Sequence, residues 1–518
     1  LELVVQKYLA ADFKHIEEFN EASNYIKEAY RFLFVADFPY GFDRSAIEDI
    51  KKLIANGPRA GIYVVMHVDP SLDKPRDLNF ETMFFPHSTV LQEQNGAFVL
   101  TFPKSIQTAY KLNALQVVPD RSPATEWINR FAANLIESSR SVTASGVPFS
   151  ELAPPPEEVW TGDARRDIHV PFGLSGALDR LDFRLGEWED SSGQKVTVNQ
   201  ALLTGKPGSG KSFTLHAIIC NLALHYPPTE LHMYLLDYKE GVEFRMYTDK
   251  KVGVSGGSAS NGSSDGTDDT TVPRPLPHAQ VVAIESEREF GLSVLRKLQA
   301  EIASRGQLFK EAGVSELADY RRVRPTETLP RILLVIDEFQ VLFVENDTIA
   351  AEANRLLDDI ARRGRSFGLH MLLSSQSPNV ANMSRDIYSR VDLRLVLQLD
   401  KNSAAVALAD GNADAVDMLD RPGEIIVNAQ AGRKDANILG QVANMTGAAR
   451  EQVLDDLQAI AQSKQWRRTT NLVVFRGNEP SSVRENTKLN TLLERRSWGE
   501  AITHQGTAIR WRDYFGDP

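Results

Sequence analysis

The sequence QALLTGKPGSGKSFTLHAIICNLAL, residues 200–224, decides how this chain folds. It places the pattern Gly-x-x-x-x-Gly-Lys-Ser between an apolar run typical of a buried strand and an apolar run typical of a helix. Glycines let the backbone N–H groups of such a loop curve around phosphates, and the N-terminus of the helix that follows favours an anion. The stretch therefore predicts a nucleotide-binding P-loop within an α/β fold.

The loop residues have distinct expected roles, with ATP and Mg²⁺ as the predicted cofactors. Lys211 is expected to reach the β- and γ-phosphates, and Ser212 is expected to bind Mg²⁺ through its hydroxyl oxygen. The nucleotide-binding residues predicted from the motif are Gly205, Lys206, Pro207, Gly208, Ser209, Gly210, Lys211, Ser212 and Phe213.

A pair of acids follows a second apolar strand, RILLVIDEF, residues 331–339. We expect this strand to neighbour the strand of the P-loop, so that Asp337 holds Mg²⁺ and Glu338 orients and deprotonates the attacking water. Gln376 ends the next strand and is predicted to contact the γ-phosphate or the water. The alternatives are ordinary structural roles, as helix-capping carboxylates and as a residue that caps a turn.

Phosphoryl transfer gains from an arginine that a neighbouring subunit supplies. The candidates are Arg363 and Arg365, in the segment ARRGRSFG, and Arg390, in the segment YSRVDLR; Arg362 and Arg394 lie in the same two segments. Most arginines in such runs are solvated or paired with nearby carboxylates. The sequence does not choose among them.

An internal repeat links the start of the chain to this region. The segments FLFVAD (32–37), NGPRAG (56–61) and IYVVMHVD (62–69) match a later strand, turn and strand, with Gly57 and Gly61 spaced as Gly364 and Gly368 are. In the first copy, Asp37 is followed by Phe38 where the second copy has Glu338, so a general base is missing. We interpret residues 1–140 as the C-terminal half of a degenerate ATPase-like domain, although many α/β folds contain similar strand–helix–strand units.

The remaining boundaries follow from composition. Residues 141–165 are rich in Pro and Ser and are predicted to be a linker, and residues 166–442 to be the ATPase domain. Residues 253–270 are predicted to form a Gly- and Ser-rich surface loop, and residues 443–518 a helical and strand bridge toward a further domain. The start at Leu1, within a helical pattern, indicates a fragment of a larger protein.

Composition excludes several classes of protein. With 42% hydrophobic and 25% charged residues and no apolar run of about 18 residues, the chain is typical of a water-soluble protein. A single cysteine, Cys220, excludes an intramolecular disulfide and favours a cytoplasmic location, with any membrane anchor outside this segment. The net charge of −11 argues against a surface built to wrap nucleic acid, but it is compatible with a narrow basic pore.

Several segments together resemble the FtsK/SpoIIIE family of bacterial motor ATPases, within the RecA-like P-loop NTPases, and most closely its members with tandem ATPase domains. They are VPFGLSG (170–176), the P-loop segment, LLDYKEGVEF (235–244), PRILLVIDEFQ (330–340), RRGRSFGLHMLLSSQ (362–376) and RPGEIIV (421–427). The resemblance implies a central, mostly parallel sheet and a homo-oligomer, usually a hexameric ring, that threads double-stranded DNA. One departure is that Lys401–Ala404 lacks the arginine that DNA pumps of the family carry in an Asp-Ser-Arg triplet.

Three functions are compatible with these features. The leading interpretation is translocation of double-stranded DNA driven by ATP hydrolysis. The chief alternative is an ATPase that drives protein export, as the related type VII secretion motors do, with membrane-bound or secretion partners outside this segment. The third is an ATP-dependent assembly switch that moves nothing.

Overall fold

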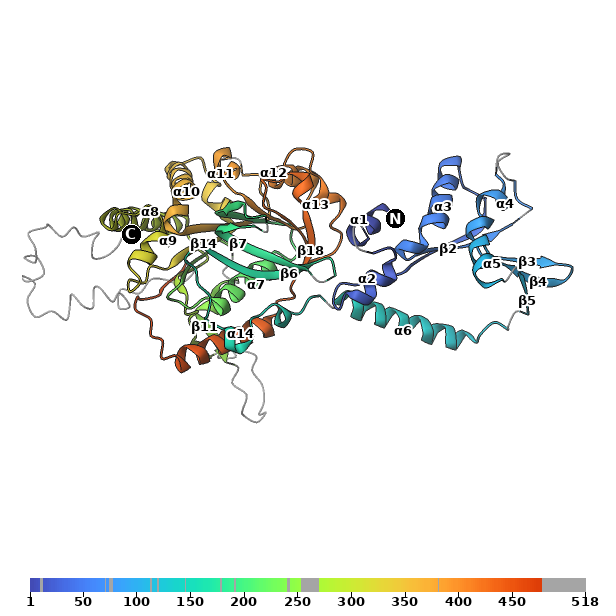
Figure 1. Ribbon diagram of the computed structural model, residues 1–518, viewed down its shortest axis with the longest axis horizontal. Helices are drawn as coiled ribbons and strands as arrows, with labels where there is room; N and C mark the ends of the chain where they lie inside the picture. The colour runs from blue at the N-terminus through green and yellow to red at the C-terminus, as the bar shows by residue number, and fades with distance from the viewer. Residues whose placement is uncertain are drawn as a thin grey trace, which may run out of the picture.

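The computed structural model describes residues 1–9, 13–69, 71–73, 78–111, 114–118, 121–144, 146–177, 179–190, 192–239, 243–252, 270–380 and 382–477. A smaller N-terminal region, up to residue 144, lies beside a larger domain (Figure 1). Nearly all of the loop predicted at 253–270, and the predicted bridge beyond residue 477, fall outside the described residues. Within the described ranges, no helix has the length and apolar character needed to span a membrane.

The large domain is built on a twelve-stranded sheet with the order β19-β13-β10-β14-β15-β9-β16-β17-β18-β6-β7-β8. From β19 to β16 all neighbours are parallel, and from β16 to β8 all are antiparallel. The strands are β6 (Asp167–Ser175), β7 (Asp179–Glu189), β8 (Lys195–Val198), β9 (Gln200–Thr204), β10 (Leu231–Asp237), β13 (Ala279–Ile284), β14 (Arg331–Asp337), β15 (Leu369–Ser375), β16 (Leu393–Val396), β17 (Glu424–Asn428), β18 (Ile438–Val442) and β19 (Val473–Arg476). The predicted α/β class with a central, mostly parallel sheet is confirmed.

Helices cover both faces of the parallel part of this sheet. One core lies between the sheet and α7, and the other between the sheet and α8 and α10. The helices are α7 (Lys211–His225), α8 (Arg288–Ala312), α9 (Leu317–Val323), α10 (Thr348–Phe367), α11 (Arg385–Ser389), α12 (Lys401–Ala407), α13 (Asp414–Asp417) and α14 (Gly447–Ser463), and the hairpin β11 (Asp249–Val252) and β12 (Thr270–Pro273) lies apart from the sheet. Strands buried on both faces explain why their sequences are almost continuously apolar.

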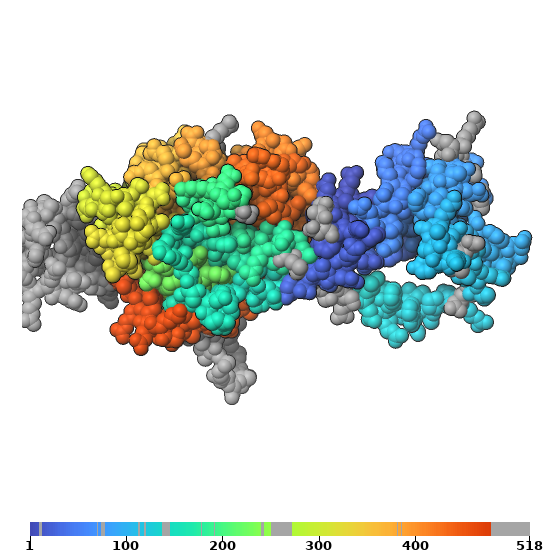
Figure 2. Space-filling model, viewed as in Figure 1, coloured from blue at the N-terminus to red at the C-terminus, as the bar shows by residue number. Residues whose placement is uncertain are grey.

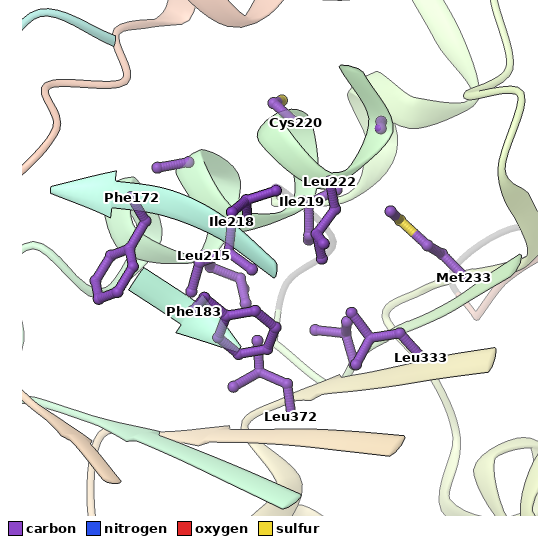
Figure 3. Packing of buried hydrophobic residues seen from close by; sticks show 14 of the residues in the cluster. Phe172, Phe183, Leu215, Ile218, Ile219, Cys220, Leu222, Met233, Leu333 and Leu372 are labelled. Carbon is purple, nitrogen blue, oxygen red and sulfur yellow. The ribbon is translucent and has the colours of Figure 1, made fainter. Parts of the chain in front are cut away.

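Helix α7 is buried nearly all round, as its apolar sequence predicts. Figure 3 shows Leu215 and Ile218 of α7 near Phe172 and Phe183, which come from β6 and β7. Met233 and Leu333, from two strands of the parallel sheet, belong to the same core. This packing holds the start of α7, where the P-loop ends, in a fixed place on the sheet.

The expected linker at 141–165 is wrong from residue 147 onward. Val147, Phe149 and Trp160 are buried in the core that includes α7, and the Trp160 indole N–H donates to the Ala223 carbonyl at 2.9 Å. A Pro- and Ser-rich composition does not reveal such anchors. The large domain therefore begins about twenty residues before the boundary predicted at 166.

The expected domain end at residue 442 is also wrong. Helix α14 packs against α7, and its Leu454 and Leu457 are buried in the same core. Strand β19 extends the central sheet beside β13. The described part of the predicted bridge therefore belongs to the large domain.

The N-terminal region contains a two-stranded parallel sheet, β1-β2, and a three-stranded antiparallel sheet, β3-β4-β5. Helix α3 packs on one face of β1-β2 through Ile47 and Ile50, while Phe32 and Phe34 on β1 are exposed. The elements are α1 (Glu2–Tyr8), α2 (Ile16–Ala22), β1 (Arg31–Phe38), α3 (Arg44–Asn56), β2 (Ile62–Val68), α4 (Phe80–Met83), β3 (Val90–Gln94), β4 (Ala97–Thr101), α5 (Lys104–Tyr110), β5 (Ala114–Val117) and α6 (Thr125–Ala144).

The blocks β1–α3–β2 and β14–α10–β15 match in backbone detail. The amide of Arg31 donates to the carbonyl of Gly61, as that of Ile332 donates to Gly368, in both cases at 2.8 Å. Gly61 and Gly368 have nearly equal φ values of 70° and 72°. The two blocks therefore align with Arg31 opposite Ile332.

This register corrects the expected alignment of the acids by one residue. Counting from Arg31 and Ile332, Ala36 stands opposite Asp337 and Asp37 opposite Glu338. Asp37 and Glu338 also share a left-handed backbone, with φ of 52° and 53°. The first copy thus lacks the equivalent of Asp337 and keeps a carboxylate, shorter by one methylene, at the position of Glu338.

Ion pairs, some of them buried, join the two regions. Lys7 on α1, whose side chain is 6% exposed, lies 3.0 Å from both Asp420 and Glu424, and Arg421 lies 2.8 Å from Glu28. In Figure 2 the dark blue N-terminal segment lies directly against the orange part of the large domain. The contact ends beside Gly423, a residue of the nucleotide site described next.

Candidate functional site

The P-loop leaves the end of β9 and passes directly into α7. Gly208 and Gly210 have φ of 80° and 110°, in the left-handed region that favours glycine. A Cβ at Gly210 would lie 3.1 Å from the backbone of Gly423, whose amide donates to the Ser209 carbonyl at 2.7 Å. The segment that precedes β17 therefore packs on the loop and helps to fix its curve.

A cavity of about 550 Å³ opens above this loop. It is lined by residues from the P-loop, from the ends of β10, β14 and β15, and from the β17 and β18 segments. They are Gly146, Lys206, Pro207, Gly208, Gly210, Lys211, Ser212, Phe213, Lys239, Glu243, Asp337, Glu338, Gln376, Pro422, Gly423, Gln441, Val442, Ala443 and Asn444. Gly205 and Ser209, also in the predicted set, belong to the loop but do not line the cavity.

The predicted lysine and acid pair meet at the floor of the cavity. Lys211 forms ion pairs with Asp337 and, at 3.0 Å, with Glu338, and all three side chains are buried. We expected the acids on the strand next to β9, but β15 lies between β9 and β14, the strand that carries them. Carboxyl ends of parallel strands share one edge of a sheet, so the acids still reach Lys211.

Charge pairing shifts the pKa of Lys211 and that of Glu338. Burial disfavours the charged form of Lys211, but Asp337 and Glu338 outweigh it and raise the pKa of Lys211. Burial also opposes ionisation of Glu338, yet Lys211 and hydrogen bonds hold the pKa of Glu338 below its ordinary value. Glu338 is therefore ionised at neutral pH, as a general base must be.

Further contacts fix the two acids. The Gln340 side chain donates to Glu338 at 2.6 Å, the Gln376 backbone N–H donates to the same carboxylate oxygen at 3.3 Å, and the Ser374 hydroxyl donates to Asp337 at 2.7 Å. Gln376 lies at the cavity, where the sequence placed it. Ser374 and Gln340 were missed, although both stand within two residues of predicted site residues.

Glu243 was also missed in the sequence. Its carboxylate accepts a hydrogen bond from the Ser212 hydroxyl at 2.5 Å and lies 3.0 Å from His216. Burial opposes ionisation of Glu243, but hydrogen bonds from His216 and Ser212 lower its pKa to about 2. The segment LLDYKEGVEF contributed to the family resemblance, but its sequence does not indicate that Glu243 contacts the P-loop.

None of the three candidate arginines lines the cavity in this copy of the chain. Arg363 pairs with Asp359 at 3.2 Å, and Arg390 pairs with Asp358 at 2.8 Å. Arg365 lines a separate cavity of about 240 Å³. Their proposed action across a subunit boundary stays a prediction. Arg394 is mostly buried, and its guanidinium donates to carbonyls of its own domain.

The donor set fits ATP and Mg²⁺. The N-terminus of the fifteen-residue helix α7 points backbone N–H groups toward the cavity, and Lys211 supplies a positive charge. Ser212 and Asp337 offer the oxygen ligands that Mg²⁺ prefers. Among the described residues, no group of three or more His, Cys, Asp or Glu could hold a metal. Ser212 and Asp337 would supply one or two ligands, as is usual where nucleotide phosphates complete the site.

Comparisons with known proteins agree with this site. The FtsK/SpoIIIE family model matches residues 156–252, which include the P-loop. The chain is 28% identical over 258 residues to the ESX secretion system protein EccC of Geobacillus thermodenitrificans (strain NG80-2), covering 48% of this chain and 15% of that protein. It is 29% identical over 229 residues to the ESX secretion system protein YukB of Bacillus subtilis (strain 168), covering 43% and 13%. The chain thus spans about a seventh of the length of these relatives.

Solved structures of similar proteins include the cytoplasmic domain of the Thermomonospora curvata type VII secretion ATPase EccC. Its TM-score is 0.46 at 21% identity, over 61% of this chain and 34% of that chain. The match of the family model, centred on the P-loop, agrees with the motifs quoted from the sequence. Residues 156–252 of the large domain, which carry the P-loop, match the FtsK/SpoIIIE family model.

Proposed function

We propose that this chain is the hydrolysing ATPase unit of a motor that drives protein export, related to the type VII secretion ATPases. The observation that carries the proposal is the similarity to EccC and YukB, both of which are named as ESX secretion system proteins. This was the alternative interpretation of the sequence. Translocation of double-stranded DNA, the leading one, has no support from these relatives.

The proposed mechanism assigns each cavity residue a task. Lys211 binds the phosphates, Ser212 and Asp337 hold Mg²⁺, and bound Mg²⁺ would neutralise charge that develops on the phosphates. Glu338 accepts a proton from the attacking water, and Gln376 contacts the γ-phosphate. Lys211 pairs with both acids and also lines the cavity. A move of Lys211 toward bound phosphates would weaken its ion pair with Glu338 and leave this carboxylate available to accept a proton.

Hydrolysis is proposed to occur between copies of the chain, assembled as a ring at the cytoplasmic side of a membrane. One of Arg363, Arg365 and Arg390 would then reach the cavity of the next copy and stabilise the transferring phosphoryl group. Each of these three arginines is at least partly exposed, so each side chain can reach beyond its own domain. Secretion partners bound to a membrane would hold the ring there.

Two measurements decide between export and DNA translocation. In cells that carry Glu338→Gln in the full-length protein, quantitative mass spectrometry of the culture medium should show a specific set of proteins lost. The ATPase rate of the purified chain should be indifferent to linear double-stranded DNA at any salt concentration. A rate that DNA stimulates and salt suppresses, with an unchanged set of exported proteins, would favour the DNA motor instead.

A further inference from the structure

Four polar side chains form a chain of hydrogen bonds from the P-loop into the core. The Ser212 hydroxyl donates to Oε1 of Glu243 at 2.5 Å, and Oε2 of Glu243 lies 3.0 Å from Nε2 of His216. Nδ1 of His216 lies 2.7 Å from the Tyr247 hydroxyl. His216 and Tyr247 are fully buried. This series of hydrogen bonds thus connects Ser212, at the cavity, to two residues that solvent does not reach.

The chemistry of the groups fixes the direction of every hydrogen bond. The Glu243 carboxylate can only accept, so both Ser212 and His216 must donate to it. A neutral imidazole that donates from Nε2 has Nδ1 free to accept, and Tyr247 O–H supplies that donor. Each of the three donors, Ser212, His216 and Tyr247, therefore has an acceptor when His216 is neutral.

Three elements anchor Glu243 independently. At the end of β10, Asp237 accepts from the backbone N–H of Lys239 at 2.8 Å and from that of Glu243 at 3.4 Å. Directly after Glu243, Phe244 and Tyr247 are buried in the core. His216 lies four residues after Ser212 on α7, so both reach the same carboxylate from one face of the helix. A side chain held this firmly suits an orienting role.

We propose that Glu243 is a positioning residue for the Mg²⁺ site. By accepting the hydrogen bond from the Ser212 hydroxyl, it turns the oxygen lone pairs of Ser212 toward the cavity and makes this oxygen a better ligand for a hard cation. His216 and Tyr247 hold Glu243 in the orientation that this requires. The inference rests on the proposed role of Ser212 as an Mg²⁺ ligand.

The test uses the whole chain and measures metal dependence without turnover. Binding of a fluorescent ATP analogue is measured in EDTA and then against increasing Mg²⁺, and Mn²⁺ affinity is measured by electron paramagnetic resonance with a non-hydrolysable analogue. Glu243→Ala should raise the metal concentration needed for half-maximal binding by about tenfold or more and leave binding in EDTA unchanged. Glu243→Gln, which keeps one acceptor oxygen for Ser212, should show a smaller rise, and Tyr247→Phe a smaller one still.

Ser212→Ala separates the inference from the assignment beneath it. If Ser212→Ala and Glu243→Ala both raise the metal concentration needed for half-maximal binding, the inference stands. If only Ser212→Ala raises it, Glu243 does not position the ligand, and the site assignment survives alone. If Ser212→Ala leaves this concentration unchanged, both are wrong. Equal loss of binding in EDTA and in Mg²⁺ for Glu243→Ala, together with a lowered melting temperature, would show a merely structural role.

Discussion

The block β1–α3–β2 and the block β14–α10–β15 place a carboxylate on the same left-handed residue, Asp37 in one and Glu338 in the other. The Asp37 side chain is 66% exposed and contacts His67 at 3.2 Å, whereas the Glu338 side chain is 5% exposed and pairs with Lys211. The shared backbone thus accounts for the position of the acid. Its burial and its partner come from the P-loop, which the described N-terminal region does not contain.

The two blocks differ most at the first position of the acid pair. Ala36 replaces the proposed Mg²⁺ ligand Asp337, while Asp37 keeps the charge of the proposed base. A carboxylate that faces solvent is a poor general base for hydrolysis, because no neighbouring group positions the attacking water.

Lys211→Ala removes the partner that distinguishes Glu338 from Asp37. Nucleotide binding should weaken and the ATPase rate should fall about 10²–10³-fold, because the phosphates lose their buried cation. Isothermal titration calorimetry and a steady-state ATPase assay measure both. Lys195→Ala, at an exposed lysine paired with Glu187, is the matched control and should change neither. Unaltered turnover in Lys211→Ala would remove the basis of the comparison.

Lys7→Ala tests whether the N-terminal region is supported by the ATPase domain. The change removes the cation that pairs with Glu424, a buried carboxylate, and should cost about 1–3 kcal/mol of unfolding free energy. Differential scanning calorimetry measures it. Lys52→Ala, which removes an exposed pair with Asp49 in the same region, should cost less than about 1 kcal/mol. Equal small losses in both variants would mean that the Lys7 contact contributes nothing.

Gly61→Ala and Gly368→Ala probe the backbone that the two blocks share. Each forces an alanine into a left-handed conformation, which costs about 1–2 kcal/mol. Gly368→Ala should cost more, because its Cβ would lie 2.4 Å from a methyl carbon of Leu317, while that of Gly61 would lie 2.9 Å from Ile16. Chemical denaturation measures both. A stabilising effect of either change would contradict the equivalence of the two glycines.

The double change Ala36→Asp with Asp37→Glu restores the acid pair of the second block in the first. In a chain whose own site is disabled by Lys211→Ala, we expect no ATPase activity above the residual rate of Lys211→Ala alone, since an acid pair without a phosphate-binding lysine has no substrate to act on. A sensitive phosphate-release assay compares the two variants. A higher rate with the restored acid pair would show that the P-loop lysine is not what separates the two blocks.

Much of the site could be predicted because its parts are local in sequence. The P-loop, the acids after an apolar strand and Gln376 each stand at a strand end, and strand ends of a parallel sheet meet at one edge. The expected adjacency of the two strands failed because strand order depends on crossovers that the sequence does not encode locally. Glu243 was missed for a similar reason, since its partners Ser212 and His216 lie about thirty residues away and meet it only in the fold.

The boundaries and the alignment of the repeat were less predictable. Pro- and Ser-rich composition predicted a linker, but Phe149 and Trp160 of this segment are buried in the core of the large domain. The repeat was recognised, yet the acids were aligned one residue out of register, because matching the Asp of each strand end ignored the backbone. The left-handed φ of Asp37 and Glu338 is a property that composition and periodicity do not report.

Glu338→Gln removes the proposed base while keeping the shape of the side chain. Binding of ATP and the steady-state ATPase rate are measured on the same preparation. ATP binding should be retained, and the rate should fall about 10²–10⁴-fold. Turnover close to that of the unmodified chain would contradict the assignment of Glu338, and with it the difference drawn between the two blocks.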